Sequence, residues 1–329
     1  MENKDFQDLL SKAKSGDPEA QFELGLCYYK GRTIKRNRKV AAKWWKLAAD
    51  QGHAEAMTWL GIACILSTQN YEEAVQRWKL AADQGNTNAQ LRLGRCYFRG
   101  NGVAQNKTEA LRLWKLCAGQ EPQAKIEIGK MYYEGDGVEQ NYEEAVKWFG
   151  SSKYWMGKCY LHGYGVEQNI AKTIELWESV AEGSYSMCLE LAHLYSEGIY
   201  MESNYQKAAY WWSQAASDDN GNPTNGVPEA LYELGCYYYE GKGVEKDLQM
   251  AVKYFKWAIK SYGRHGDGKA YAEMAFREEP ERVQQEVRKY YNAYRMVIKL
   301  GDKSVIRKLR FLAQNGEVEA KNILEEFGM

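Results

Sequence analysis

Seven basic side chains cluster in the middle of the sequence, at spacings that place them on one face of successive helices. They are Arg92, Arg95, Arg99, Lys125, Lys130, Lys158 and His162. Glu127 and Glu134 are the opposing charges. Ordinary solvated helix faces are one interpretation of this cluster. The other is a basic surface that receives an acidic protein segment or a C-terminal carboxylate.

From the second interpretation we predict a groove that binds another protein or a peptide. Its residues are the basic Arg92, Arg95, Arg99, Lys130, Lys158 and His162, with the aromatic anchors Tyr29, Phe98, Tyr133 and Tyr239 beside them. Large aromatic side chains and arginines dominate the binding energy of many protein interfaces. Burial of these rings between neighbouring helices is the alternative.

Other patterns that could support chemistry each lack an essential element. The four histidines, at positions 53, 162, 193 and 265, form no HExxH or i,i+4 pair. Four residues fall at calcium-loop offsets: Asp218, Asn220, Asn222 and Glu229. However, Pro223 occupies the position where that loop needs Gly. The Gly-x-Gly-Val segments, as at 100–103, lack the Lys-Ser/Thr of a phosphate loop. We therefore predict no catalytic residue, no cofactor and no metal site.

Charge balance and the lack of long apolar runs exclude further classes. The chain has 44 Lys and Arg and 44 Asp and Glu, so no net field favours nucleic acid or an anionic membrane. No run approaches the roughly 18 apolar residues that span a bilayer, and no signal peptide is apparent. The seven cysteines form no CxxC pair, which fits a reducing compartment. We expect a monomeric cytoplasmic protein, with a translocated effector as the alternative.

A repeated pair of helices positions these side chains. The first helix is marked by a small residue and a Gly five positions later, as at Ala20/Gly25, Ala56/Gly61, Ala89/Gly94, Ala124/Gly129 and Ala230/Gly235. Degenerate copies occur at Ser152/Gly157 and Met187/Ala192. Apolar residues directly before the Gly and three positions after it complete one buried stripe. In all copies but that of Gly61, the stripe ends at a glycine break or turn, and in four of them this turn is Gly-x-Gly-Val.

The second helix begins at a residue that can cap it: Asn37, Asn70, Asn106, Asn141, Asn169, Asn204 or Asp247. An Ala or Thr follows four residues later, and aromatic residues follow that. These aromatic residues are Trp44-Trp45, Trp78, Trp114, Trp148-Phe149, Trp177, Trp211-Trp212 and Tyr254-Phe255. We expect the large rings to pack against the Gly and Ala of the first helix.

The repeat length identifies the fold class. In six copies, 16 residues separate the Gly of the first helix from the small residue of the second, as from Gly94 to Ala110. Only 13 separate Gly61 from Ala74, because that copy lacks the Gly-rich turn. Repeats of this length are typical of tetratricopeptide-like arrays. The sequence predicts an all-α, right-handed α-α superhelix of seven helix-pair repeats with half-repeat caps.

Residues 88–118, NAQLRLGRCYFRGNGVAQNKTEALRLWKLCA, resemble the consensus of the SEL-one-like repeat (SLR) family. The resemblance extends over about residues 5–261 and implies a non-catalytic adaptor that binds a protein or peptide in a concave groove. In tetratricopeptide-like arrays the first helices line that groove. An immunity or inhibitor protein that neutralises a toxin or an enzyme is the alternative. An enzyme or cell-wall regulator with a site assembled in the groove is a further one.

The repeat is irregular at several places. We predict a repeat array at 1–261, with a half-repeat cap at 1–16 and irregular segments at 149–152 and 217–226. A bend is expected at the first segment and a mobile loop at the second. Residues 262–329 are expected to form a helical C-terminal cap with a degenerate repeat, or else a docking element.

Overall fold

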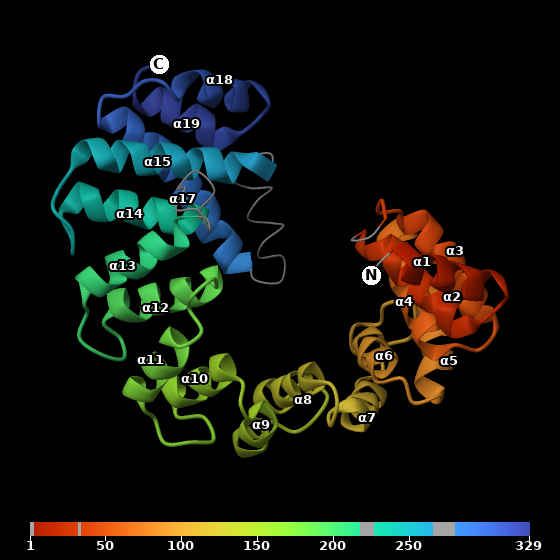
Figure 1. Ribbon diagram of the computed structural model, residues 1–329. Coiled ribbons are helices and arrows are strands. Elements are labelled where there is room, and N and C mark those ends of the chain that lie inside the picture. The colour runs from red at the N-terminus through yellow and green to blue at the C-terminus, as the bar shows by residue number, and fades with distance from the viewer. Residues whose placement is uncertain (1–2, 32–33, 218–226, 266–279) are drawn as a thin grey trace. The chain divides into compact units, whose positions relative to one another are not determined.

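The computed structural model describes residues 3–31, 34–217, 227–265 and 280–329. In these residues all regular structure is helical (Figure 1), which confirms the predicted all-α class. No helix in this part of the chain is both long and apolar enough to cross a membrane. The predicted loop at 217–226 falls almost wholly outside the described residues.

The helices alternate between the two kinds that the repeat predicts. The first helices are α2 (Pro18–Lys30), α4 (Ala54–Thr68), α6 (Thr87–Arg99), α8 (Pro122–Glu134), α10 (Lys153–His162), α12 (Tyr185–Glu197) and α14 (Pro228–Glu240). The second helices are α3 (Arg38–Asp50), α5 (Tyr71–Asp83), α7 (Lys107–Cys117), α9 (Tyr142–Phe149), α11 (Ile170–Glu178), α13 (Tyr205–Ala215) and α15 (Leu248–Tyr262).

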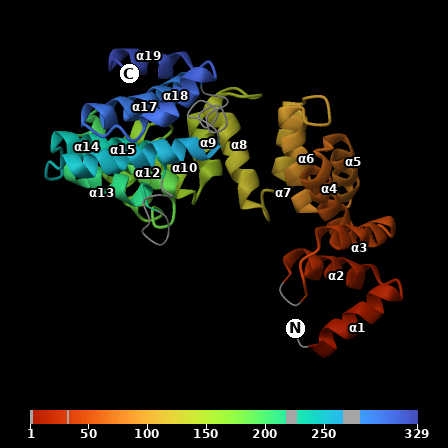
Figure 2. The same ribbon diagram turned by 90° about the horizontal axis from the view of Figure 1, so that it is seen from above.

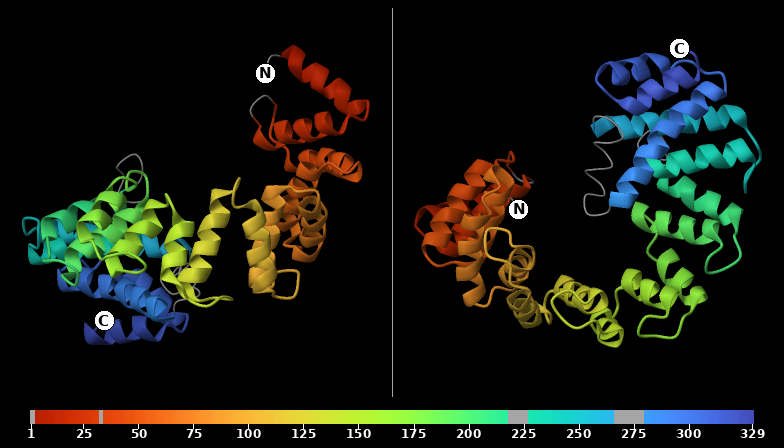
Figure 3. Two further views of the ribbon diagram at one scale, coloured as in Figure 1. Left: turned by 90° about the horizontal axis from the view of Figure 1, so that it is seen from below. Right: turned by 180° about the vertical axis from the view of Figure 1, so that it is seen from behind.

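Further helices lie at both ends of the chain. The helix α1 (Asn3–Lys14) packs on α2, as the view from above shows (Figure 2). The short η2 (Gly263–His265) follows α15. The long α17 (Pro280–Lys299) runs diagonally across α14 and α15 (Figure 3), and α18 (Ile306–Gln314) pairs with α19 (Val318–Glu326). The assignment of these ends as caps stays a prediction.

The contacts within the chain divide it into two compact units. The first comprises Met1–Ser152 with Tyr164–Val166, and the second comprises Lys153–Gly163 with Glu167–Met329. The helix α9 ends at Phe149 after 8 residues, and Gly150 follows with a φ of 50°. The predicted division at residue 261 and the predicted bend at 149–152 stay predictions.

Side-chain caps fix where the second helices begin. The Oδ1 atom of Asn37 accepts a hydrogen bond from the backbone N of Val40 at 3.1 Å. The same bond recurs in the later copies, at Asn70, Asn106, Asn141, Asn169, Asn204 and Asp247. Each cap satisfies a backbone N–H that the helix itself leaves unpaired. The predicted starts of all seven second helices are therefore confirmed.

Small residues of the first helix lie against large rings of the second, as predicted. A Cβ atom added to Gly94 would lie closer than 3.0 Å to the Trp114 ring, and the same is true of Gly61 and Trp78. Trp114 is buried, and its Nε1 donates a hydrogen bond to the Leu91 carbonyl at 3.1 Å. The two helices of a repeat can approach this closely only where a side chain is missing.

Gly94→Ala is accordingly expected to destabilise the protein by about 1–3 kcal/mol, because the added methyl group overlaps the Trp114 indole. Urea denaturation followed by circular dichroism measures the change. Gly119→Ala is the matched control, since a Cβ at Gly119 meets no atom within 4 Å. Equal stability of the two variants would contradict the close packing at Gly94.

Candidate interaction surface

Three arginines of α6 lie on one face of that helix because they are three and four residues apart. Arg92, Arg95 and Arg99 line a hollow of about 230 Å³ in the first unit. Its apolar wall comes from α4 and α5 and consists of Ile62, Ile65, Leu66, Tyr71 and Trp78. The structure therefore brings together three of the six predicted basic groove residues.

Of these three arginines, only Arg95 forms an ion pair within the described residues. Its Nη2 lies 2.8 Å from Oε1 of Glu127 on α8, and its Nε donates to the same oxygen at 3.0 Å. Arg92 donates from Nε to the neutral Asn88 side chain at 2.7 Å. Arg99 is exposed. The guanidinium groups of Arg92 and Arg99 thus have no close carboxylate among the described residues.

Electrostatics around Arg92 favour an anion in this hollow. Burial, together with the positive charge of Arg95, lowers the pKa of Arg92. A guanidinium nevertheless stays protonated near neutral pH, so this position holds a charge that its surroundings disfavour. A carboxylate bound here would offset that cost and would accept charge-assisted hydrogen bonds.

The other predicted basic residues lie elsewhere. Lys130 is half-buried on α8 in the first unit. Lys158 and His162 belong to α10 in the second unit. Lys158 lies 3.7 Å from the Glu190 carboxylate and 5.0 Å from the Tyr154 ring centroid, and His162 Nδ1 lies 3.0 Å from the Tyr200 hydroxyl.

The four predicted aromatic anchors are all half-buried. Three of them lie beside an aromatic residue of the second helix in their own repeat, with ring centroids 5.5–6.1 Å apart: Tyr29 beside Trp45, Phe98 beside Trp114 and Tyr133 beside Phe149. Tyr239, in the second unit, lies under the ammonium groups of Lys246 and Lys299. Part of each ring therefore belongs to the core of its repeat.

The second unit contains a buried ionic cluster that the sequence patterns do not predict. Lys289 of α17 lies 2.8 Å from Glu229, 3.2 Å from Glu233 and 3.3 Å from Glu286. His193 Nε2 lies 3.1 Å from Glu229, and the Tyr262 hydroxyl donates to Glu286 at 2.6 Å. The cluster joins α17 to α12, α14 and α15.

The carboxylates of this cluster titrate differently. Burial opposes ionisation of Glu229, but the hydrogen bond from His193 and the charge of Lys289 hold its pKa at about 2. Burial and the charge of Glu229 raise the pKa of Glu286. Glu229 is also the last of the four residues at calcium-loop offsets. The other three positions, Asp218, Asn220 and Asn222, lie outside the described residues.

Four cysteines are poorly suited to act as nucleophiles. Burial raises the pKa of Cys96, Cys117 and Cys159 to about 11, and that of Cys236 to about 12. The thiolate is the reactive form of cysteine, and it is scarce at neutral pH when the pKa is this high. Cys96 and Cys159 are buried in the cores of their repeats.

Comparisons with known proteins agree with the repeat fold. A family model described as the Sel1 repeat matches seven segments, at residues 18–53, 54–86, 87–118, 122–153, 150–185, 186–220 and 228–261. Together these segments cover more than half of the chain. No curated protein matches it.

Several solved structures resemble this chain, and two of them have similar folds over more than four fifths of it. One is a protective antigen present in uropathogenic Escherichia coli strains, described as displaying an SLR fold, with 24% identity and a TM-score of 0.60 over 96% of this chain and 70% of that one. The other is a Sel1 repeat protein from Oxalobacter formigenes, with 25% identity and a TM-score of 0.58 over 82% of this chain and 79% of that one.

Proposed function

The chain belongs to the Sel1 repeat family, and we propose that it is a non-catalytic interaction scaffold that binds an acidic segment of a protein or peptide along its first helices. The observation that carries this proposal is the convergence of Arg92, Arg95 and Arg99 on one hollow, where Arg95 alone is paired with a carboxylate in the described residues. Stacked helix pairs form extended binding surfaces whose exposed residues can vary without unfolding the core.

Binding of a carboxylate fits this hollow better than binding of a neutral ligand does. The apolar wall of α4 and α5 shields the site from water on one side, so a charge pair here is less screened than on an open surface. In the second unit, Lys158, His162 and Tyr239 are proposed as separate contacts for a bound protein, as the sequence predicts.

Reversing the charge of Arg92 and Arg99 tests the proposal. We expect the Arg92→Glu/Arg99→Glu variant to bind a labelled acidic pentapeptide, Glu-Glu-Ala-Glu-Glu, more than about tenfold more weakly than the wild type, as fluorescence anisotropy would measure. Arg95 is left intact because its ion pair with Glu127 links α6 to α8. The thermal midpoint should change little, since no ion pair of Arg92 or Arg99 is lost in the described residues.

A second variant controls for net charge. Lys46→Glu/Lys115→Glu makes the same change in charge on exposed positions of α3 and α7. We expect this variant to keep most of the affinity, with a loss that disappears at high salt. Equal weakening by the two variants would show that the peptide responds only to overall charge, and the proposed site would then be wrong.

A further inference from the structure

The Gly-x-Gly-Val turn of a repeat covers the start of the second helix in the repeat before it. A Cβ on the second Gly would lie closer than 3.0 Å to the first residue of that helix, at Gly102 and Tyr71, Gly137 and Lys107, Gly165 and Tyr142, and Gly243 and Tyr205. Gly102 has a φ of 67°, which favours glycine there. The Val after this glycine packs on the core in three of these turns, at Val103, Val138 and Val244.

The second repeat lacks this turn. Its first helix, α4, continues to Thr68, and Gln69 then turns with a φ of 53° directly into the cap of α5 at Asn70. The shortening by three residues removes the counterparts of Gly102 and Val103. In the register of the other repeats, these counterparts would cover the start of α3 at Arg38. This start is therefore left uncovered by the second repeat.

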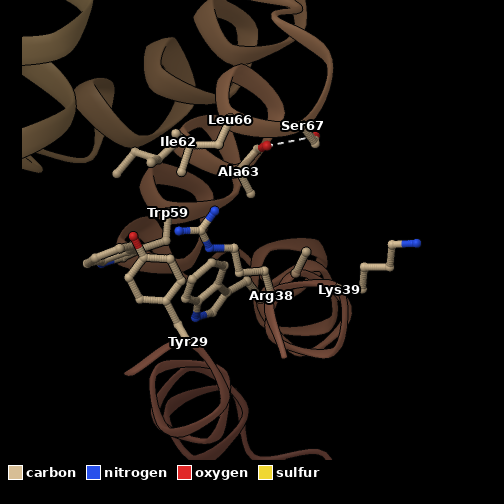
Figure 4. A pocket seen from close by; sticks show the side chains of 10 residues that line it. Tyr29, Arg38, Lys39, Trp59, Ile62, Ala63, Leu66 and Ser67 are labelled. Atoms are coloured by element: carbon tan, nitrogen blue, oxygen red, sulfur yellow. Dashed lines mark hydrogen bonds between the residues drawn. The ribbon is translucent and has the colours of Figure 1, made fainter. Parts of the chain in front are cut away.

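A hollow of about 290 Å³ lies at this uncovered place (Figure 4). The rings of Tyr29, Trp45 and Trp59 form one wall, with centroids 5.2–5.6 Å apart. Ala42 and aliphatic residues of α4 form much of the rest. The volume is at the small end of the range of ligand pockets, about 300–1,000 Å³, so the hollow suits one large side chain better than a cofactor.

The charges around the hollow indicate which residues of the bound segment lie beside that side chain. Figure 4 shows the Arg38 guanidinium reaching over the rings and Lys39 pointing away from them. Both residues are exposed, and neither forms an ion pair with a described residue. Leu66, which is 57% exposed, lines both this hollow and the one that holds Arg92, Arg95 and Arg99. One bound segment can therefore reach both.

We propose that the missing turn of the second repeat opens a pocket for an aromatic side chain of the bound segment. Acidic residues of the segment flank this aromatic residue. The partner's ring enters the hollow beside Tyr29, Trp45 and Trp59, and its carboxylates meet Arg38 and the arginines of α6. This inference rests on the proposed binding of an acidic segment and adds the residue that anchors it.

Two acidic pentapeptides that differ at one position test the anchor. We expect Glu-Glu-Phe-Glu-Glu to bind the full chain at least about tenfold more tightly than Glu-Glu-Ala-Glu-Glu, as isothermal titration calorimetry would measure. Two variants should abolish this difference. In one, residues 67–69 are replaced by a copy of residues 100–105, which restores the turn. In the other, Ala42→Leu fills the hollow directly.

Ala171→Leu is the matched control, because it adds the same group at an exposed position of α11 and should keep the difference. If the two peptides bind equally to the wild type, or if their difference survives both closing variants, the anchor proposal is wrong. Equal binding that still depends on Arg92 and Arg99 would leave the proposed function standing. A preference for Phe that does not depend on these arginines would support the anchor and contradict the acidic site.

Discussion

Lys289→Ala is expected to destabilise the second unit by about 3–5 kcal/mol near neutral pH, because it leaves buried carboxylates without their shared cation. The Lys289 ammonium lies within 3.3 Å of Glu229, Glu233 and Glu286, and the last of these is 2% exposed. Urea denaturation followed by circular dichroism measures the loss. Arg288→Ala removes an exposed cation from the next position of α17 and should cost less than about 0.5 kcal/mol.

The pH dependence distinguishes this ionic effect from a loss of packing. The pKa of Glu229 is lowered to about 2 in the folded protein. The charge of Glu229 therefore stabilises the folded state above the pKa that this residue has in the unfolded chain, and the stabilisation is lost as pH falls toward 2. The pKa of Glu286 is raised, so protonation stabilises the folded state as pH falls. The stabilities of wild type and Lys289→Ala should therefore converge in acid. A constant gap from neutral to acidic pH would show that the Lys289 stem, and not its charge, stabilises the unit.

Local features of the repeat were predictable from the sequence. The caps at Asn106 and Asn141 and the close packing of Gly94 on Trp114 each depend on residues at most one repeat apart, and they recur with the same spacing. A wrong assignment in one copy would have broken the agreement with all the others. For that reason the helix boundaries and the rings of the core follow from one sequence.

Long-range contacts of individual residues were not predictable in this way. Lys289 and Glu229 are 60 positions apart, and Lys289 lies on a helix outside the repeat pattern, so no spacing relates them.

The Arg95–Glu127 pair, in contrast, has a signal in the sequence. Arg95 follows the Gly of its helix by one position and Glu127 precedes the next such Gly by two, and Lys158 and Glu190 have the same relation, with Ala192 in place of the Gly. Comparing equivalent positions in adjacent repeats would have found these pairs.

The missing turn was visible in the sequence, but its consequence was not. The interval from Gly61 to Ala74 showed that three residues were absent. Only the structure shows that a turn covers the preceding repeat, as Gly102 covers Tyr71. Loss of the turn therefore leaves the start of α3 at Arg38 uncovered, in the repeat before the one that carries the deletion.

Trp114→Ala is expected to cost about 3–5 kcal/mol, because it removes a buried ring and leaves a cavity opposite Gly94. Trp114→Phe should cost less, about 1–3 kcal/mol, mainly through the lost hydrogen bond to the Leu91 carbonyl. The repeats with Phe149 and Phe255 at this position show that a smaller ring fits between the helices. Chemical denaturation of each variant measures these costs, with Leu116→Ala as a control at a position 58% exposed.

The pairing of Gly94 with Trp114 makes a stricter prediction about the double variant. Gly94→Ala lowers the free energy of unfolding only because the Trp114 indole occupies the space that the methyl group needs. In a Trp114→Ala background that space is empty, and the added methyl group should be neutral or should fill part of the cavity. The two costs are therefore expected to be strongly non-additive. If the two free-energy costs instead add, Gly94 is required by the backbone of α6 and not by the Trp114 ring. The explanation that the small residue of the repeat makes room for the ring would then be wrong.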